Sequence, residues 1–409
     1  MALRLLGRVR AFPRRSLVFS QVARQYHDYV RVASPNGIIR VPLASPKIIG
    51  VATSRGNRGH QEDFHGFATL SLNPEELRLS VKKFHGVDWD PSKVDPLLAR
   101  QAVFVGIYDG CASHSPDGSV VDLSRHGGSA VAQYLRQELH GIFESVHKSQ
   151  IPELFAWIKE IGGYFKRFRG GALTPWIHGT EGTPELDLEA RATEAFFEVD
   201  KNLSIDDTAE YCGATASVAI FHSLDAPSTT FFSADKLSLT VAHCGDTRVL
   251  LTAVDGGTVY PMTENHHADA HVESIRLRRM MGSSLMTDSF GESSLGDLRF
   301  KKFGVTPEPE VRSRLLNGNE WSSVILVSDG ISSMVSDQEV VDLARHAPHP
   351  KVAAERILSF SQELGSGDNG TAIVVPLKGW GKTQGPDKTK ELRKYRLKQA
   401  EGSERQRRM

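Results

Sequence analysis

The sequence is poor in cysteine and lacks several common catalytic signatures. Among its 409 residues, only positions 111, 212 and 244 are cysteine, and no two of them form a Cys-x-x-Cys pair. This argues against a zinc cluster or a disulfide framework and favours reduced thiols. No Cys-x5-Arg sequence is present, which argues against a thiolate phosphatase. No Walker A sequence is present either, which argues against a P-loop kinase or NTPase.

Net charge and long apolar runs are also missing. The chain has 49 basic and 49 acidic side chains, so it has no overall field that would attract nucleic acid or an anionic membrane. No apolar run is long enough to cross a bilayer. The length suits one large domain with extensions, or two domains. We therefore expect no nucleic acid partner and no membrane span.

The charge is unevenly distributed at the N-terminus. The first acidic residue is Asp28, and before it stand the six arginines Arg4, Arg8, Arg10, Arg14, Arg15 and Arg24. An arginine-rich, acid-poor and amphipathic leader is typical of mitochondrial import. We expect residues 1–26 to be a transit peptide and the mature protein to lie in the mitochondrial matrix. The alternative is a disordered basic tail that is not a targeting signal.

Hydrophobic patterning predicts an α+β protein. The predicted strands cover residues 48–52, 102–108, 214–221, 237–242, 323–327 and 371–375. The predicted helices cover residues 129–146, 188–199 and 351–364, and a capping box at Ser336 starts another. Residues 70–99, 111–125 and 162–184 are expected to be irregular, and residues 382–409 form a basic polar tail, either helical or disordered. Strands and helices cluster rather than alternate, which argues against a doubly wound parallel sheet.

Four aspartates stand at strand ends. Asp109 and Asp329 each follow a buried run and precede a glycine, Asp246 follows residues 237–242, and Asp368 precedes residues 371–375. One such residue is best interpreted as part of a turn. Four carboxylates brought together would repel one another unless cations lay between them, and Mg²⁺ and Mn²⁺ prefer oxygen ligands. Arg58, upstream of Glu62 and Asp63, is a candidate phosphate clamp.

These residues belong to a longer ordered set of motifs. It comprises Arg58, Glu62-Asp63, Asp109-Gly110, His126-Gly127-Gly128-Ser129, Gly213-Ala214-Thr215-Ala216, Cys244-Gly245-Asp246, Leu295-Gly296-Asp297, Thr306-Pro307-Glu308-Pro309, Asp329-Gly330 and Asp368-Asn369. Each motif alone is weak, but the set in this order resembles the PPM (PP2C-type) serine/threonine phosphatases. The resemblance runs from about residue 48 to 376. It implies a PP2C-like four-layer α/β/β/α sandwich of two antiparallel sheets flanked by helices.

The resemblance also implies a role for each site residue. Two Mg²⁺ or Mn²⁺ ions would be bridged by Asp109, with Asp329 and Asp368 completing one, and Glu62 and the Gly110 carbonyl completing the other. Asp63 would hold metal-bound water, and Asp246 with Asp329 would serve a weaker third ion. A metal-bridging hydroxide would attack phosphorus directly, Arg58 would bind the phosphate, and His126 would protonate the leaving oxygen.

The sequence departs from the family pattern beside the metal site. Family members read Asp-Gly-His without a gap, whereas here Cys111 follows Gly110, and the expected His-Gly-Gly-Ser begins only at His126. We interpret residues 111–125 as an insertion, which puts the Gly110 ligand in question. His114 inside the insertion is the alternative general acid, and His126 is preferred because a helix start holds a catalytic group better than a loop does.

The predicted function is hydrolysis of phosphoserine and phosphothreonine in proteins, by a monomeric enzyme. The resemblance to mitochondrial family members makes a pyruvate dehydrogenase subunit one candidate substrate. A catalytically weak or dead scaffold of the same fold is the alternative, and a small-molecule phosphatase is a weaker one. All principal ligands are present, which favours an active enzyme.

Overall fold

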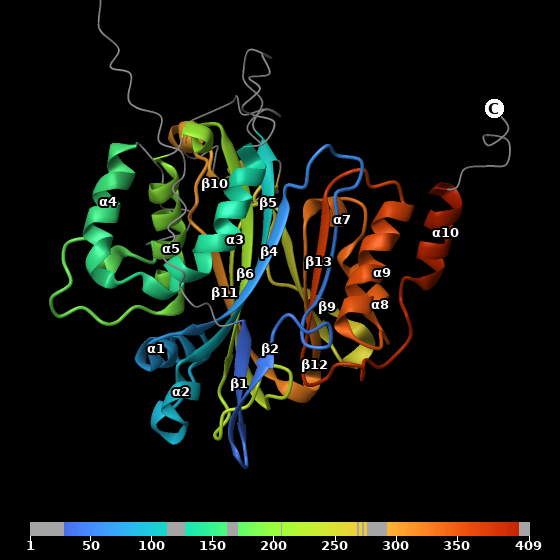
Figure 1. Cartoon of the computed structure of the whole chain (residues 1–409), viewed down its shortest axis with the longest axis horizontal. Helices are drawn as coiled ribbons and strands as arrows, with labels where there is room; N and C mark the ends of the chain where they lie inside the picture. Colours follow the sequence, from blue (N-terminus) through green and yellow to red (C-terminus); the bar gives the residue numbers. More distant parts are fainter. Residues whose placement is uncertain are drawn as a thin grey trace, which may run out of the picture.

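The computed structural model describes residues 28–112, 127–161, 171–205, 207–267, 270–271, 274–275 and 293–400. Two antiparallel β-sheets lie face to face at the centre of the molecule, and helices cover their outer faces (Figure 1). The layers therefore run helix, sheet, sheet, helix. This confirms the α+β sandwich expected from the sequence.

The first sheet has the strand order β11-β7-β6-β5-β4, and β10 pairs with β6 outside this path. Its strands are β4 (Asp63–Ser71), β5 (Gln101–Ala112), β6 (Cys212–Ser223), β7 (Lys236–Cys244), β10 (Leu295–Gly296) and β11 (Glu310–Asn317). The second sheet has the order β3-β13-β12-β8-β9. Its strands are β3 (Gly50–Ser54), β8 (Arg248–Ala253), β9 (Val259–Pro261), β12 (Trp321–Val327) and β13 (Gly370–Pro376). A separate hairpin joins β1 (Tyr29–Ser34) to β2 (Gly37–Pro42).

The helices divide between the two outer faces (Figure 1). On the side of the first sheet lie α1 (Pro74–His85), α2 (Pro96–Ala99), α3 (Gly127–Ser145), α4 (Ile151–Glu160) and α5 (Leu188–Leu203). On the side of the second sheet lie α7 (Asp329–Ser332), α8 (Asp337–Ala344), α9 (Pro350–Glu363) and α10 (Lys390–Ala400). Within these described ranges, no helix combines the length and the apolar character needed to span a membrane.

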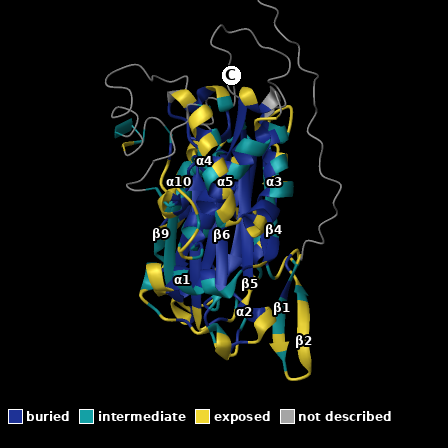
Figure 2. Ribbon diagram, turned by 90° about the vertical axis from the view of Figure 1, so that its left-hand side faces the viewer, coloured by how far each residue is buried: buried dark blue, intermediate teal, exposed yellow. Residues whose placement is uncertain are grey.

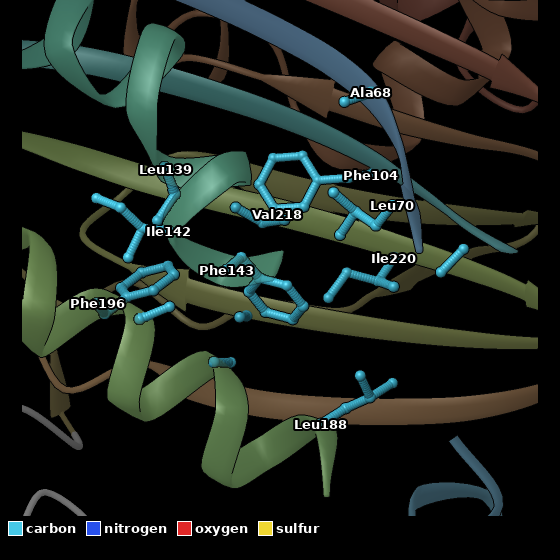
Figure 3. Packing of buried hydrophobic residues seen from close by; sticks show 14 of the residues in the cluster. Ala68, Leu70, Phe104, Leu139, Ile142, Phe143, Leu188, Phe196, Val218 and Ile220 are labelled. Atoms are coloured by element: carbon cyan, nitrogen blue, oxygen red, sulfur yellow. The ribbon is translucent and has the colours of Figure 1, made fainter. Parts of the chain in front are cut away.

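The central strand β5 supplies side chains to two separate cores. Phe104 and Tyr108 point to the helix side, where Phe104 lies 5.8 Å from the Phe143 ring centroid of α3 (Figure 3). Val105 and Ile107 point into the space between the sheets. Successive side chains of a strand face opposite ways, so a nearly continuous apolar run fits a strand that is buried on both faces.

Strand β12 has the same two-sided pattern in the second sheet. Val324 and Leu326 lie between the sheets, whereas Ile325 and Val327 lie under the outer helices with residues of α8 and α9. The polar residues near the end of β5 and directly after β12 continue this alternation. Asp109 continues the inward-facing row of β5, and Ser328 continues that of β12, so both are directed between the sheets.

The irregular segment expected at residues 70–99 is wrong, because helix α1 occupies much of it. Asn73 caps the helix by accepting a hydrogen bond from the Glu75 N–H, and Pro74 opens its first turn. The buried face of α1 includes Glu76 and Ser80 as well as apolar residues. Apolar periodicity alone therefore did not predict this helix, because part of its buried face is polar.

The loop expected to begin at residue 111 begins later. Cys111 and Ala112 still belong to β5 and pair with Gly213 and Cys212 of β6. Helix α3 then starts at Gly127, close to the expected position. The remainder of the proposed insertion, together with His114 and His126, lies outside the described residues, as does the proposed transit peptide.

The described part of the C-terminal tail ends in helix α10 and is attached to α8. The Thr389 N–H and hydroxyl both donate to Asp342 Oδ2, at 3.1 and 2.9 Å. Arg345 pairs with the other oxygen of the same carboxylate at 3.2 Å. Arg396 of α10 lies 2.7 Å from Glu339. Of the two alternatives for this tail, the helix is correct for residues 390–400, whereas residues 382–389 are irregular.

Candidate active site

The alternation of five strands directs polar residues to one end of the space between the sheets. Asp63 of β4 stands directly opposite Asp109 of β5, and Asp109 stands opposite Thr215 of β6. Ser328 and Thr371 approach from β12 and β13 of the second sheet. Asp109 and Asp329, two of the strand-end aspartates, are therefore brought together with Asp63 from the Glu62-Asp63 motif.

Hydrogen bonds across the two sheets fix Asp63. The Ser328 hydroxyl donates to Asp63 Oδ2 at 2.6 Å, and the Thr371 N–H donates to the Ser328 oxygen at 2.9 Å. The other oxygen, Asp63 Oδ1, is buried and meets no donor among the described groups, and the same holds for Asp109 Oδ2. Buried carboxylate oxygens without a partner are destabilising, so both are available to a cation or to a water held by one.

Burial and mutual repulsion disturb the protonation of these aspartates. Burial, with a contribution from the Asp329 charge, raises the pKa of Asp63 to about 6. Burial and the neighbouring charges of Asp63, Asp329 and Asp246 raise the pKa of Asp109 well above its usual range. Burial also raises the pKa of Asp329. Carboxylates that cannot all be ionised side by side need protons or divalent cations between them.

The donor set fits a hard divalent cation. All the candidate ligands are carboxylate or carbonyl oxygens, which Mg²⁺ and Mn²⁺ prefer. Among the described residues, no three acidic, histidine or cysteine side chains already surround one point at metal-ligand distances. Asp109 and Asp329 instead lie close enough to influence each other's protonation. Small side-chain rotations would have to accompany loading with cations.

The loop that carries Arg58 and Glu62 is tied to the start of β13. The Glu62 N–H donates to Asn369 Oδ1 at 2.7 Å, and Asn369 Nδ2 donates to the carbonyls of Arg55 and His60 at 2.8 and 3.0 Å. Asn369 was part of the sequence motif, but its action as a clamp depends on contacts that only the fold creates. The clamp fixes the backbone on which Glu62 stands.

Gly110 lies where only a glycine fits. Its N–H donates to the Glu62 carbonyl at 3.1 Å. A Cβ atom on Gly110 would come within 2.5 Å of the Gly128 backbone, and a Cβ on Gly128 within 2.9 Å of Gly110. The two glycines therefore let the start of α3 approach the end of β5 closely. Because β5 continues through Gly110, the insertion leaves this part of the strand regular, and the carbonyl stays a candidate ligand.

Arg58 and Asp368 form an ion pair at the more exposed rim of the site. Arg58 Nη2 lies 2.5 Å from Asp368 Oδ2, and the two side chains are 59% and 36% exposed. The hydrogen bond and charge of Asp368 raise the pKa of Arg58. Arg58 is therefore a permanent cation beside the carboxylates. It would have to share or leave Asp368 to bind a phosphoryl group.

Asp246 reaches the cluster through a turn that requires glycine. Gly245 has φ of +116°, and a Cβ there would meet Thr215 Cβ at 2.3 Å. The Asp246 charge contributes to the raised pKa of Asp109, which places it near the same carboxylate group. The structure thus groups Asp246 with the other strand-end aspartates.

A further polar network, which motif reading did not reveal, supports the neighbouring Leu-Gly-Asp segment. Asp200 and Lys301 form a fully buried ion pair at 2.7 Å, and Asp200 Oδ1 also accepts the Gly296 N–H at 2.7 Å. The Ser294 hydroxyl donates to Asp297 Oδ2 at 2.6 Å, and the Asp297 N–H donates to the Cys212 carbonyl. No local sequence signal links Asp200 to this segment, since the pairing crosses about a hundred residues.

Comparison with known proteins gives consistent similarities. The sequence profile of a family described as "Protein phosphatase 2C" matches residues 107–370. Protein phosphatase 2C homolog 4 of Schizosaccharomyces pombe is 28% identical over 418 residues, covering 96% of this chain and 97% of that protein. The mitochondrial protein phosphatase 1K of Xenopus laevis is 32% identical over 214 residues, covering 48% of this chain and 53% of that protein. The serine-threonine phosphatase 2C structure from Toxoplasma gondii has a TM-score of 0.49 at 16% identity, covering 86% of this chain and 100% of that one.

Proposed function

Because this chain belongs to the protein phosphatase 2C family of metal-dependent serine/threonine protein phosphatases, we propose that it dephosphorylates proteins of the mitochondrial matrix. The matching family profile covers more than half of the chain. The observation that supports catalysis by the chain itself is the crowding of Asp63, Asp109 and Asp329, with unsatisfied buried oxygens on two of them. A scaffold without activity would be more stable with apolar or amide residues at these positions.

We assign the metal ligands as the sequence motifs suggest. Asp109 would bridge two Mg²⁺ or Mn²⁺ ions, and the remaining ligands would be Glu62, the Gly110 carbonyl, Asp329 and Asp368. Asp246 with Asp329 would hold a weaker third ion. When bound, such ions activate water and neutralise charge on a phosphoryl group.

The side chains around the ions would orient the reactants. Asp63 is held by Ser328 through one oxygen, so its second oxygen is free to accept a hydrogen bond from the attacking water. Arg58 would exchange its contact with Asp368 for two parallel hydrogen bonds to phosphoryl oxygens. The backbone clamp at Asn369 keeps this arginine's loop in position for that exchange.

The activity is tested with a panel of phosphopeptides and added Mn²⁺. We expect turnover of phosphoserine and phosphothreonine peptides, and little turnover of the matched phosphotyrosine peptide. If the purified protein binds these peptides with Mn²⁺ present but turns over none of them, and also fails on p-nitrophenyl phosphate, the scaffold alternative is correct. Phosphoproteomics of matrix from cells lacking the protein would then identify substrates, among which a pyruvate dehydrogenase subunit is our first candidate.

The location is tested with the leader alone. A reporter fused to residues 1–40 is expected to enter the mitochondrial matrix and to lose about the first 26 residues, because the six leader arginines and the absence of acidic residues suit import. Deleting residues 2–26 from the whole chain should leave it in the cytosol. Replacing the six arginines by glutamine in the reporter is the matched control. A reporter with the intact leader that stays cytosolic would overturn the assignment.

The general acid is tested by comparing leaving groups. His126→Ala is expected to slow phosphopeptide hydrolysis about a hundredfold and p-nitrophenyl phosphate hydrolysis much less, because a serine alkoxide needs a proton to leave and nitrophenolate does not. His114→Ala should change neither rate. The reverse result, a selective loss in His114→Ala alone, would mean that the insertion itself reaches into the active site.

A further inference from the structure

The β1–β2 hairpin projects from one end of the molecule (Figures 1 and 2), and it contacts the Gln101 end of β5, away from Asp109. It is fastened to the first sheet by side chains rather than by strand pairing. The Gln101 amide accepts the Arg31 N–H at 2.8 Å and donates to the Arg31 carbonyl at 3.0 Å. The Thr69 hydroxyl donates to the Tyr29 carbonyl at 2.8 Å. The inner edge of the hairpin is therefore occupied.

Two arginines face each other across this hairpin. Arg31 stands directly opposite Arg40. Because the N–H and C=O of Arg31 turn away from β2 to meet Gln101, this is a non-hydrogen-bonded pair, in which the side chains approach most closely. Both guanidinium groups lie over the Tyr29 ring, 5.4 and 4.6 Å from its centroid.

Like charges directly opposite each other destabilise a strand pair. Contact with an aromatic face offsets part of this repulsion. Among the described residues, no carboxylate forms an ion pair with Arg31 or Arg40. Both planar guanidinium groups are therefore held against one aromatic ring, and neither has an ion-pair partner in the part of the chain that the structure describes. This arrangement suits carboxylate groups, which guanidinium binds through two parallel hydrogen bonds.

Within the described residues, the outer edge of β2 is open. No strand of the described chain pairs with this edge. By the same alternation, the N–H and C=O groups of Ile38 and Arg40 point away from β1 toward this edge. The side chains of Ile38 and Ile39 are 40% and 51% exposed. An exposed edge with apolar side chains is a template for an added strand.

We propose that this hairpin binds an acidic, extended segment of a partner protein, which adds to β2 as a third strand and places carboxylates against Arg31 and Arg40. The open backbone edge favours a peptide over an anionic lipid surface, because lipid headgroups cannot form the repeated backbone hydrogen bonds. Gln101 and Asp109 stand at opposite ends of β5, roughly 26 Å apart. Binding at the hairpin is thus separate from the phosphatase chemistry and does not depend on it.

Hydrogen exchange of the full chain gives a readout confined to the proposed edge. The probe is a short synthetic peptide that alternates glutamate with valine, and its control replaces every glutamate with glutamine. We expect the acidic peptide, but not the control, to slow exchange of the Ile38 and Arg40 amides. Absence of protection in residues 37–42 would overturn the proposal, even if the peptide bound elsewhere. Protection by anionic phospholipid vesicles but not by the peptide would identify a membrane surface as the occupant, and would overturn it too.

Three variants distinguish the contribution of the arginine charges to peptide binding from that of the backbone edge of β2. Arg31→Gln combined with Arg40→Gln should weaken peptide binding on the order of tenfold or more, whereas the corresponding Arg→Lys pair should restore only part of it, because lysine lacks the planar fork. Ile38→Pro removes an outward N–H without touching the hydrogen bonds to β1, and should also abolish edge protection. All three should hydrolyse p-nitrophenyl phosphate at the wild-type rate. Unchanged peptide affinity in the Arg→Gln pair, with the hairpin intact, would overturn the proposal.

Discussion

Replacing Asp109 with asparagine is expected to lower phosphopeptide turnover at least about a hundredfold and, at the same time, to raise the melting temperature of the metal-free protein. The rate falls because Asp109 is the proposed bridge between the ions. The stability rises because Asp109 is buried among Asp63, Asp329 and Asp246, whose charges oppose its ionisation. An amide of the same shape relieves this repulsion. Turnover with Mn²⁺ and thermal melting in EDTA measure the two effects.

Asp200→Asn is the matched control for this variant. Asp200 is also fully buried, but it is paired with the cationic Lys301, and the one neighbouring carboxylate that acts on it is Asp297. Removing its charge leaves the buried Lys301 ammonium without a counter-charge and with the Ser294 carbonyl as its remaining acceptor, so this variant should melt at a lower temperature. Asp109→Asn that also melts lower, with turnover retained, would mean that Asp109 is a structural residue and not part of the chemistry.

Removing divalent cations is expected to abolish activity and to reverse the dependence of stability on pH. Burial raises the pKa of Asp63 to about 6 and raises those of Asp109 and Asp329. Between the unfolded pKa of 3.8 and these raised values, the folded metal-free protein holds more protons than the unfolded chain. Its stability should therefore fall as pH rises from about 4 to 7.

Added Mn²⁺ or Mg²⁺ should have the opposite effect, because cations bind the ionised carboxylates and must displace their protons. The rise in melting temperature produced by the cation should thus grow with pH over the same range. Melting in EDTA and in excess Mn²⁺, at about pH 5 and about pH 7.5, gives the comparison. Full turnover in excess EDTA, or identical pH profiles with and without the cation, would refute the metal site.

The sequence predicted the buried strands and the aspartates at their ends because both signals are local. Apolar runs before Asp109 and Asp329 identify strands buried on both faces, and alternation along them directs the next polar residues between the sheets. The sequence did not predict the roles of residues whose partners are distant in the chain. Glu76 of α1 is buried only because Arg191, 115 residues away, neutralises it. Likewise, only the strand register shows that Arg31 and Arg40 of the hairpin stand opposite each other.

The site roles fall between these two cases. Asp63, Asp109 and Asp329 come together as the motifs suggested, and Asp246 lies close enough to influence Asp109. Ser328 could have been identified by extending the alternation of β12 by one step, since it precedes Asp329. Asn369 was identified as part of a motif, but its role as a clamp could not be, because the clamp joins the start of β13 to a loop far back in the chain. Whether a residue's role could be predicted therefore depended more on its sequence separation from its partners than on its residue type.

The pairing of β3 with β13 has a consequence for how the protein matures. Gly50–Ser54 forms the outer strand beside Gly370–Pro376, and the Asn369 clamp joins residues 307 positions apart. Neither contact can form until nearly the whole chain has been synthesised, because the partners of each contact stand near opposite ends of the domain sequence. The proposed cation-binding end would therefore assemble last, and nascent chains would expose one unpaired β-edge and have no phosphatase activity.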